Sequence, residues 1–296
     1  MSRGCILVGL DGSTASDAAV GVAIEEAVHR RVPLLAVHSW LLTDRDLPVE
    51  GRSRVDPAIR DQLLKALTAR MEVAVGDRPV DRLDCQVVYG YAGRVLAGLS
   101  SGPVLAVVGA GADRPFREWP FGSVSRYVVE HARCPVMVVR GVPASPGRRV
   151  VVGVDGSQAS LAALSWADGY AVIHRIPLVA VVAGGPSSAW APFRGPPFAV
   201  ARTAWSRTAR ATLDSCLREA LPAQRTGAAT AVVTPGPATS AVLGLVDERD
   251  LVVVGRRRPH GLAGFSMRSV ERKLLAEVPG SIVVVSSDER CGAPQA

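Results

Sequence analysis

The sequence VGLDGS at residues 8–13 returns as VGVDGS at residues 152–157, which lies 144 residues later. A second pair keeps this spacing, because HRRVPLLAV at 29–37 is matched by HRIPLVAV at 174–181 around the prolines Pro33 and Pro177. A period of about 145 residues is too long for a solenoid repeat and suits a duplicated whole domain. We therefore predict two domains, 1–141 and 148–288, joined by a short linker rich in Pro, Gly and Ser.

Composition excludes several classes of protein. The chain carries a formal charge of +7 and is 48% hydrophobic, with no apolar run long enough for a membrane helix and no signal-peptide core. Its five cysteines are odd in number and never form a CxxC pair, so neither a disulfide framework nor a structural zinc site is indicated. We expect a globular, cytoplasmic protein.

Apolar runs alternate with helical patterns through the first copy. The expected strands are 6–10, 34–39, 85–89, 104–109 and 136–140, and the expected helices are 18–31, 57–75, 94–100 and 123–132. Thr14 and Asp17 stand at capping-box spacing before the first helix. Strands that are apolar on both faces and separated by helices predict a doubly wound α/β domain with a parallel sheet. Such sheets bind ligands beyond the carboxyl ends of their strands.

Two of these strand ends carry residues suited to a nucleotide. Asp11 follows the first strand, and a glycine-rich turn at 109–112 follows the fourth, before Gly122-Ser123-Val124-Ser125 opens a helix. Glycines and a helix N-terminus present N–H groups to phosphate, while a carboxylate accepts hydrogen bonds from a ribose. Each piece also has a structural interpretation, since tight turns need glycine and Asp11 suits a helix cap. Together they predict a nucleotide divided between two strand ends.

Other chemistry has no matching pattern. The sequence has no Walker loop, no G-x-S-x-G elbow, no HExxH and no EF-hand motif. Its five histidines are dispersed, and His29 and His174 fall in the last turns of equivalent helices, where a cation favours the helix C-terminus. We assign no catalytic residue and no metal site, and do not expect an enzyme.

At this point the residues resemble a family. The motifs V-G-x-D-G-S and V-V-G…G-S-V-S-R, followed by H-x-x-C-P-V-x-V-V, are similar to those of the universal stress protein family, and both copies match over nearly their whole length. The resemblance implies a tandem member with two Rossmann-like domains, each a five-stranded parallel sheet in order 3-2-1-4-5. Nucleotide-binding members of that family carry G-x2-G-x9-G-[ST].

The resemblance assigns roles to residues of the first copy. Asp11 stands at the ribose-binding position and Ser39 where adenine is contacted, while Ala112 replaces the second glycine of the phosphate motif. Neighbouring Gly111 is a candidate to take over that turn. The cofactor-binding candidates of the first domain are Gly9, Leu10, Asp11, Ser39, Val108, Gly109, Ala112, Gly122, Ser123, Val124 and Ser125.

The second copy departs further from the motif. Asp155, Gly255 and Ser269 are kept, but Arg258 and Arg268 replace two glycines. Glu271 stands where the first copy has Ser125, and its charge repels phosphate. We expect loss of ordinary ATP binding there, with direct binding of phosphate by the arginines, including the run 256–258, as the alternative.

The resemblance implies a cytoplasmic stress-response protein that binds an adenine nucleotide, ATP with or without Mg²⁺, in its first domain. The second domain would be mainly a pairing partner, with pairing through the fifth strands, 135–140 and 281–286, within or between chains. A scaffold without nucleotide is the alternative, and slow ATP hydrolysis a further one, for which the loop offers only Asp113 and Glu118. Nucleic-acid binding ranks last, because aromatic residues are only 5% and no basic patch interleaves with them.

Overall fold

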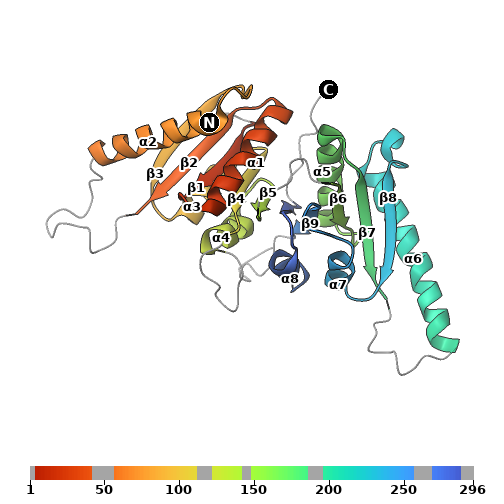
Figure 1. Cartoon of the computed structure of the whole chain (residues 1–296). Helices are drawn as coiled ribbons and strands as arrows, with labels where there is room; N and C mark the ends of the chain where they lie inside the picture. Colours follow the sequence, from red (N-terminus) through yellow and green to blue (C-terminus); the bar gives the residue numbers. More distant parts are fainter. Residues whose placement is uncertain are drawn as a thin grey trace. The chain divides into compact units, whose positions relative to one another are not determined.

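The computed structural model describes residues 4–41, 57–111, 122–141, 148–185, 196–256 and 269–287 (Figure 1). Contacts between residues divide the chain into two compact units, Met1–Gly141 and Val142–Ala296. Each unit is an α/β layer structure, as the sequence predicts.

Unit 1 alternates strands and helices along its described residues. In chain order these are β1 (Ile6–Leu10), α1 (Thr14–Arg30), β2 (Leu34–Trp40), α2 (Pro57–Val75), β3 (Leu83–Tyr89), α3 (Ala92–Leu99), β4 (Leu105–Gly109), α4 (Ser123–His131) and β5 (Val136–Val139). The strands pair in parallel in the order β3-β2-β1-β4-β5, which confirms the predicted 3-2-1-4-5 sheet.

Unit 2 repeats this plan. Its elements are β6 (Val150–Gly153), α5 (Gln158–His174), β7 (Leu178–Gly184), α6 (Pro196–Ala220), the 3-10 turn η2 (Ala223–Arg225), β8 (Ala229–Pro235), α7 (Ala238–Leu243), β9 (Leu251–Arg256), α8 (Ser269–Glu277) and β10 (Ile282–Ser286). The parallel order β8-β7-β6-β9-β10 is the same as in unit 1.

The core of each unit lies along its central strands. In unit 1 the helices form two contacting pairs, α1 with α2 and α3 with α4, and β1 packs against helices from both pairs. Val8 at the centre of β1 pairs with Ala36 of β2 and Val107 of β4, and all three are fully buried. Continuous apolar strands of this kind occur in parallel sheets because helices cover both faces.

The ends of the first helix are the same in both units. Arg31 and Arg175 follow α1 and α5 with φ of 53° and 55°, the left-handed conformation common at helix C-termini. At the other end the expected capping box is wrong by one residue, because Ser13 rather than Thr14 caps α1.

No described helix is both long and apolar enough to cross a bilayer.

Candidate functional site

The turn after β1 holds an ionised carboxylate at the carboxyl edge of the sheet. Asp11 is exposed, and its Oδ1 accepts hydrogen bonds from the backbone N–H of Ser13 at 2.9 Å and from the Ser13 hydroxyl at 2.6 Å. Partial burial opposes ionisation of Asp11, but bonds from Ser13, Ser16 and its own backbone outweigh it and lower the pKa. The carboxylate is therefore charged at neutral pH.

The same turn already caps helix α1. The Ser13 hydroxyl oxygen accepts from the backbone N–H of Ser16 at 3.2 Å, and Gly12 takes a φ of +85° that favours glycine. Since the Ser16 N–H in the first turn of α1 already has a side-chain partner, this helix start is less suited to a phosphate than one without a cap. The carboxylate of Asp11 is the feature that the turn offers to a ligand.

The start of α4 is built differently. Its N-cap residue is Gly122, which supplies no side-chain hydrogen bond to the first turn. The Gly122 N–H donates to the carbonyl of Ala110 at 3.0 Å, and a Cβ on Gly111 would come within 3.1 Å of the Gly122 backbone. The two ends of the glycine-rich loop are thus held together, next to a helix start whose N–H groups lack a side-chain cap.

Gly111 carries the left-handed backbone of this turn. Its φ is +69°, a conformation that side chains disfavour. The sequence names Gly111 as the residue that would take over the turn from the missing second glycine, and the backbone of Gly111 suits that role. Ala112 itself lies outside the described residues.

The two serines of α4 have different surroundings. Ser123 is exposed, whereas Ser125 is buried and its hydroxyl donates to the Gly122 carbonyl at 3.0 Å. Val124 is half-buried between them. Of the two hydroxyls, that of Ser123 is the one presented to a ligand, and the Ser125 hydroxyl secures the turn.

Four of the candidate residues serve packing. A Cβ on Gly109 would lie 2.5 Å from the Ala15 carbonyl oxygen, and one on Gly9 would lie 2.6 Å from Leu96 Cδ1. The side chains of Leu10 and Val108 are buried in the core. These residues let α1 and α3 approach the sheet closely, and only their backbone is available to a ligand.

The end of β2 presents a polar and aromatic corner. The Ser39 hydroxyl donates to the Gly90 carbonyl, and His38 Nδ1 donates to the Leu10 carbonyl at 3.0 Å. Trp40 is buried, and its ring meets that of Tyr89 edge-to-face at 5.5 Å. Sequence reasoning identified Ser39 but missed His38 and Tyr89, although both lie at the carboxyl ends of expected strands.

Unit 2 keeps the turn after its first strand, which holds Asp155, but its α8 start differs from the α4 start of unit 1. Asp155 Oδ1 accepts from the Ser157 N–H at 2.9 Å, which reproduces the bond of Asp11. Gly255 repeats the close approach of Gly109, since its Cβ would lie 2.2 Å from the Ala159 carbonyl oxygen. In the first turn of α8, however, Glu271 is a buried acidic residue.

The arginines of the second copy are only partly described. Arg256, the first arginine of the run 256–258, is the buried last residue of β9. Arg258 and Arg268 lie outside the described residues, as do Asp113 and Glu118 of the first copy. Ser269 is the first residue of α8, and its side chain is likewise outside the description. The direct phosphate-binding alternative for the arginines therefore stays a prediction.

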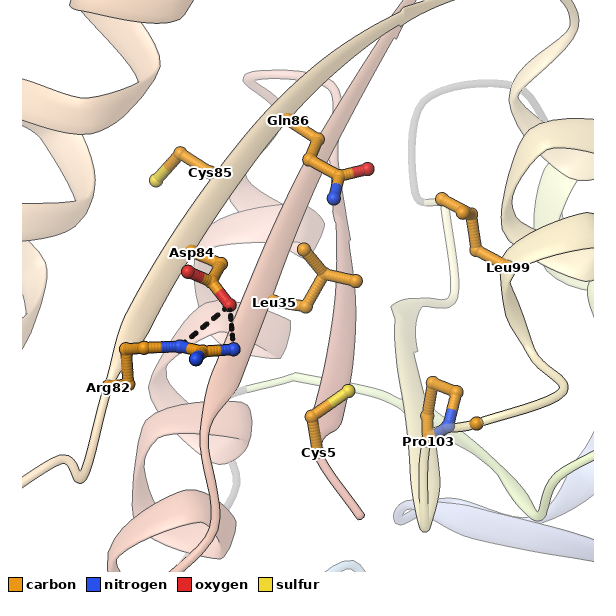
Figure 2. Close-up of a pocket in the computed structure, with 9 residues that line it drawn as sticks. Cys5, Leu35, Arg82, Asp84, Cys85, Gln86, Leu99 and Pro103 are labelled. Atoms are coloured by element: carbon orange, nitrogen blue, oxygen red, sulfur yellow. Dashed lines mark hydrogen bonds and ion pairs between the residues drawn. The ribbon is translucent and has the colours of Figure 1, made fainter. Parts of the chain in front are cut away.

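A separate hollow lies at the amino ends of β1 to β3 in unit 1, with a volume of about 590 Å³ (Figure 2). Leu35, Leu99 and Pro103 give it apolar walls, and Arg82 is engaged by Asp84 at 2.6 and 3.0 Å. Figure 2 shows the Cys85 side chain on the side of β3 opposite to Asp84. None of the predicted site residues lines this hollow.

Among the described residues, no group of His, Cys, Asp or Glu is arranged to hold a metal.

Comparison with known proteins agrees with this architecture. The family model described as the universal stress protein family matches residues 4–140 and 147–286. A universal stress protein of Mycobacterium tuberculosis is 28% identical over 312 residues, covering 96% of both chains. Another from the same organism is 37% identical over 136 residues, 46% of this chain and 45% of that protein.

A solved structure shares the fold at low sequence identity. The universal stress protein of Archaeoglobus fulgidus superposes with a TM-score of 0.69 at 14% identity, covering 96% of this chain and 98% of that one. The family model accounts for both repeats of the sequence, and this structure matches nearly the whole chain. The chain therefore belongs to the universal stress protein family, as a tandem member with two domains of that family.

Proposed function

We propose that unit 1 binds an adenine nucleotide, ATP in the first instance, at the carboxyl edge of its sheet. The observation that carries the proposal is the start of α4, where Gly111 and Gly122 are held backbone to backbone and the first turn has no side-chain cap. N–H groups at such a helix start attract phosphate through direct hydrogen bonds and the helix dipole.

Neighbouring strand ends supply the rest of the site. β1 lies between β2 and β4 in the sheet, so Asp11 stands between the α4 start and the corner at Ser39. The charged Asp11 carboxylate suits ribose hydroxyls, which donate hydrogen bonds, and it repels phosphate. A nucleotide would lie with its phosphates at Ser123, its ribose at Asp11 and its base toward Ser39.

Unit 2 lacks this combination. Asp155 is placed like Asp11, but the acidic Glu271 occupies the first turn of α8 and disfavours a phosphate there. We propose that unit 2 binds no ordinary ATP and serves mainly as a pairing partner.

A scaffold that binds no nucleotide is the second candidate. It is favoured by the internal hydrogen bonds of the site, since Asp11, Ser39 and Ser125 all bond to their own chain. These groups therefore have a structural role with or without a ligand. The two candidates differ in whether the site has measurable affinity.

Titration calorimetry of the full chain with ATP tests the proposal. We expect one nucleotide per chain, and freshly purified protein to release nucleotide detectable by mass spectrometry. Asp11→Asn should weaken binding by about 1 to 3 kcal/mol, because a charged hydrogen-bond acceptor is lost. Asp155→Asn, the matched control in unit 2, should leave the affinity unchanged.

Three results would count against the proposal. Absence of any heat of binding with ATP, ADP and AMP would favour the scaffold. Two nucleotides per chain would show that unit 2 is also a working site. Equal losses from Asp11→Asn and Asp155→Asn would lead to the same conclusion.

A further inference from the structure

A guanidinium from α2 lies against the same turn that carries Asp11. Arg70 Nη2 forms an ion pair with Asp17 in the first turn of α1. Arg70 Nη1 lies 3.6 Å from the point that a Cβ on Gly12 would occupy. Among the described residues Nη1 has no acceptor. The turn is therefore flanked by a cation, on the side of α1 that faces α2.

This cation is a property of unit 1. In unit 2 the equivalent glycine, Gly156, faces the Thr212 methyl group of α6 at 3.4 Å. The position of Asp17 is taken by Leu161, which is buried. Helix α6 thus approaches its turn as α2 does, but with apolar contacts. The guanidinium and the uncapped glycine-serine turn occur together in unit 1 and are both replaced in unit 2.

The ion pair leaves Arg70 available to a ligand. The side chains of Arg70 and Asp17 are 45% and 54% exposed, and ion pairs this exposed to solvent contribute little to stability. A guanidinium bonded to a phosphate gains more, because the charge-assisted bonds are bidentate. Phosphate on a ligand at Asp11 would therefore draw Arg70 away from Asp17 at little cost.

We propose that unit 1 selects adenine nucleotides that carry a second phosphate on the ribose, at the 2′ or 3′ oxygen, and that Arg70 binds that phosphate. The inference rests on the proposed function, which places the ribose at Asp11 and the 5′-phosphates at α4. In dinucleotide-binding folds a carboxylate binds the free ribose hydroxyl, whereas a nearby arginine accommodates a ribose phosphate. Here Asp11 would accept from the hydroxyl that stays free, and the Arg70 charge would offset the repulsion between Asp11 and the added phosphate. The ligand would then have an anion-binding group at each end, the start of α4 and the Arg70 guanidinium.

Calorimetry with AMP, adenosine 3′,5′-bisphosphate and adenosine 2′,5′-bisphosphate tests this. We expect one bisphosphate to bind the full chain at least about tenfold more tightly than AMP, the gain typical of a hydrogen bond to a charged group. Arg70→Gln should remove this preference while AMP affinity is kept.

Arg78→Gln is the matched control. Arg78 follows the C-terminus of α2 and pairs with Glu25 of α1 at 3.3 Å, so it links the same two regions of unit 1 away from the Asp11 turn. We expect Arg78→Gln to leave the preference for the bisphosphate over AMP unchanged. This control distinguishes a role of Arg70 in ligand binding from a role in holding α1 against α2. Thermal unfolding of both variants checks that neither has lost its fold.

The possible failures are distinguishable. If no nucleotide binds, the proposed function itself is wrong. If AMP binds and neither bisphosphate binds more tightly, only the ribose-phosphate inference is overturned. A preference that survives Arg70→Gln, or an equal loss of AMP affinity in that variant, would also overturn it, the latter because Arg70 would then contact the base or the 5′-phosphate.

Discussion

Glycines of one motif have different physical roles in this protein. Gly109 and Gly255 stand directly beneath the first helix of their units, where a Cβ would overlap the carbonyls of Ala15 and Ala159. Gly111 provides a left-handed turn and Gly122 an uncapped helix start. Gly255 persists where the phosphate turn has changed, which is explained by packing and not by a ligand.

Replacement of either packing glycine should therefore destabilise the fold. We expect Gly109→Ala and Gly255→Ala each to lower the free energy of unfolding by about 1 to 3 kcal/mol, because a backbone carbonyl must move. Gly21→Ala in α1 is the control, since nothing lies within 4 Å of its Cβ position, and it should be stabilising by roughly 0.5 to 1 kcal/mol. Urea unfolding monitored by circular dichroism measures all three. No loss at Gly255 would contradict the packing explanation.

At the scale of the element, the helix starts of α1 and α5 differ from that of α4. Helices α1 and α5 are capped by Ser13 and Ser157, whose hydroxyl oxygens each accept at 3.2 Å from a first-turn N–H. Helix α4 begins at Gly122 without such a cap. A serine fits at that position, since its Cβ would be 3.7 Å from Gly111 and 3.8 Å from Ser125 Oγ, with φ of −61° and ψ of 150°.

Gly122→Ser should therefore stabilise helix α4 and lower the affinity of unit 1 for ATP. A capping hydroxyl adds roughly 0.3 kcal/mol to stability relative to glycine. It also competes for the N–H groups that phosphate would use, so ATP affinity should fall by about tenfold, or ~1.4 kcal/mol. Pro237→Ser at the start of α7 in unit 2 is the control for affinity, because that helix also lacks a side-chain cap. Unchanged ATP affinity in the Gly122→Ser variant would show that the start of α4 does not bind the phosphate.

At the scale of the whole molecule, the fifth strand of each unit is the last strand in its order. In β5, the carbonyls of Pro135 and Val139 accept from β4, so the intervening even-numbered residues direct their N–H groups away from β4. In β10, the Ser281 carbonyl accepts from β9 and Ser287 donates to it, and the same alternation holds. Backbone N–H and C=O groups along such a strand edge favour pairing with another strand.

Pairing through the fifth strands predicts slow hydrogen exchange at these outward amides. We expect the N–H groups of Val138 and Val284 to be protected in the full chain, because a paired edge satisfies them. Exchange followed by NMR, with light scattering to count chains, distinguishes pairing within a chain from pairing between chains. Rapid exchange at both amides would show that the fifth strands are unpaired in solution.

Much of the fold follows from patterns read along the chain. The proline Pro57 begins α2 as expected, and all nine elements predicted for the first copy are present with boundaries shifted by a few residues. Such features depend on local preferences and on burial with a regular period, which a sequence carries directly. The duplication was accessible from the repeats, whereas the sheet order was implied only by the resemblance to the family that the motifs carry.

Only the tertiary structure decided which of the candidate side chains are exposed and which are buried. The sequence by itself treats Ser123 and Ser125 alike, and it cannot show that Ser125 is buried and bonded to Gly122 while Ser123 is exposed. It also gives no sign that Arg70 lies against Gly12, or that Gly109 lies beneath Ala15. These facts arise from the packing of helices on the sheet, which brings together residues far apart in the chain, whereas each helix and strand is specified largely by its own residues.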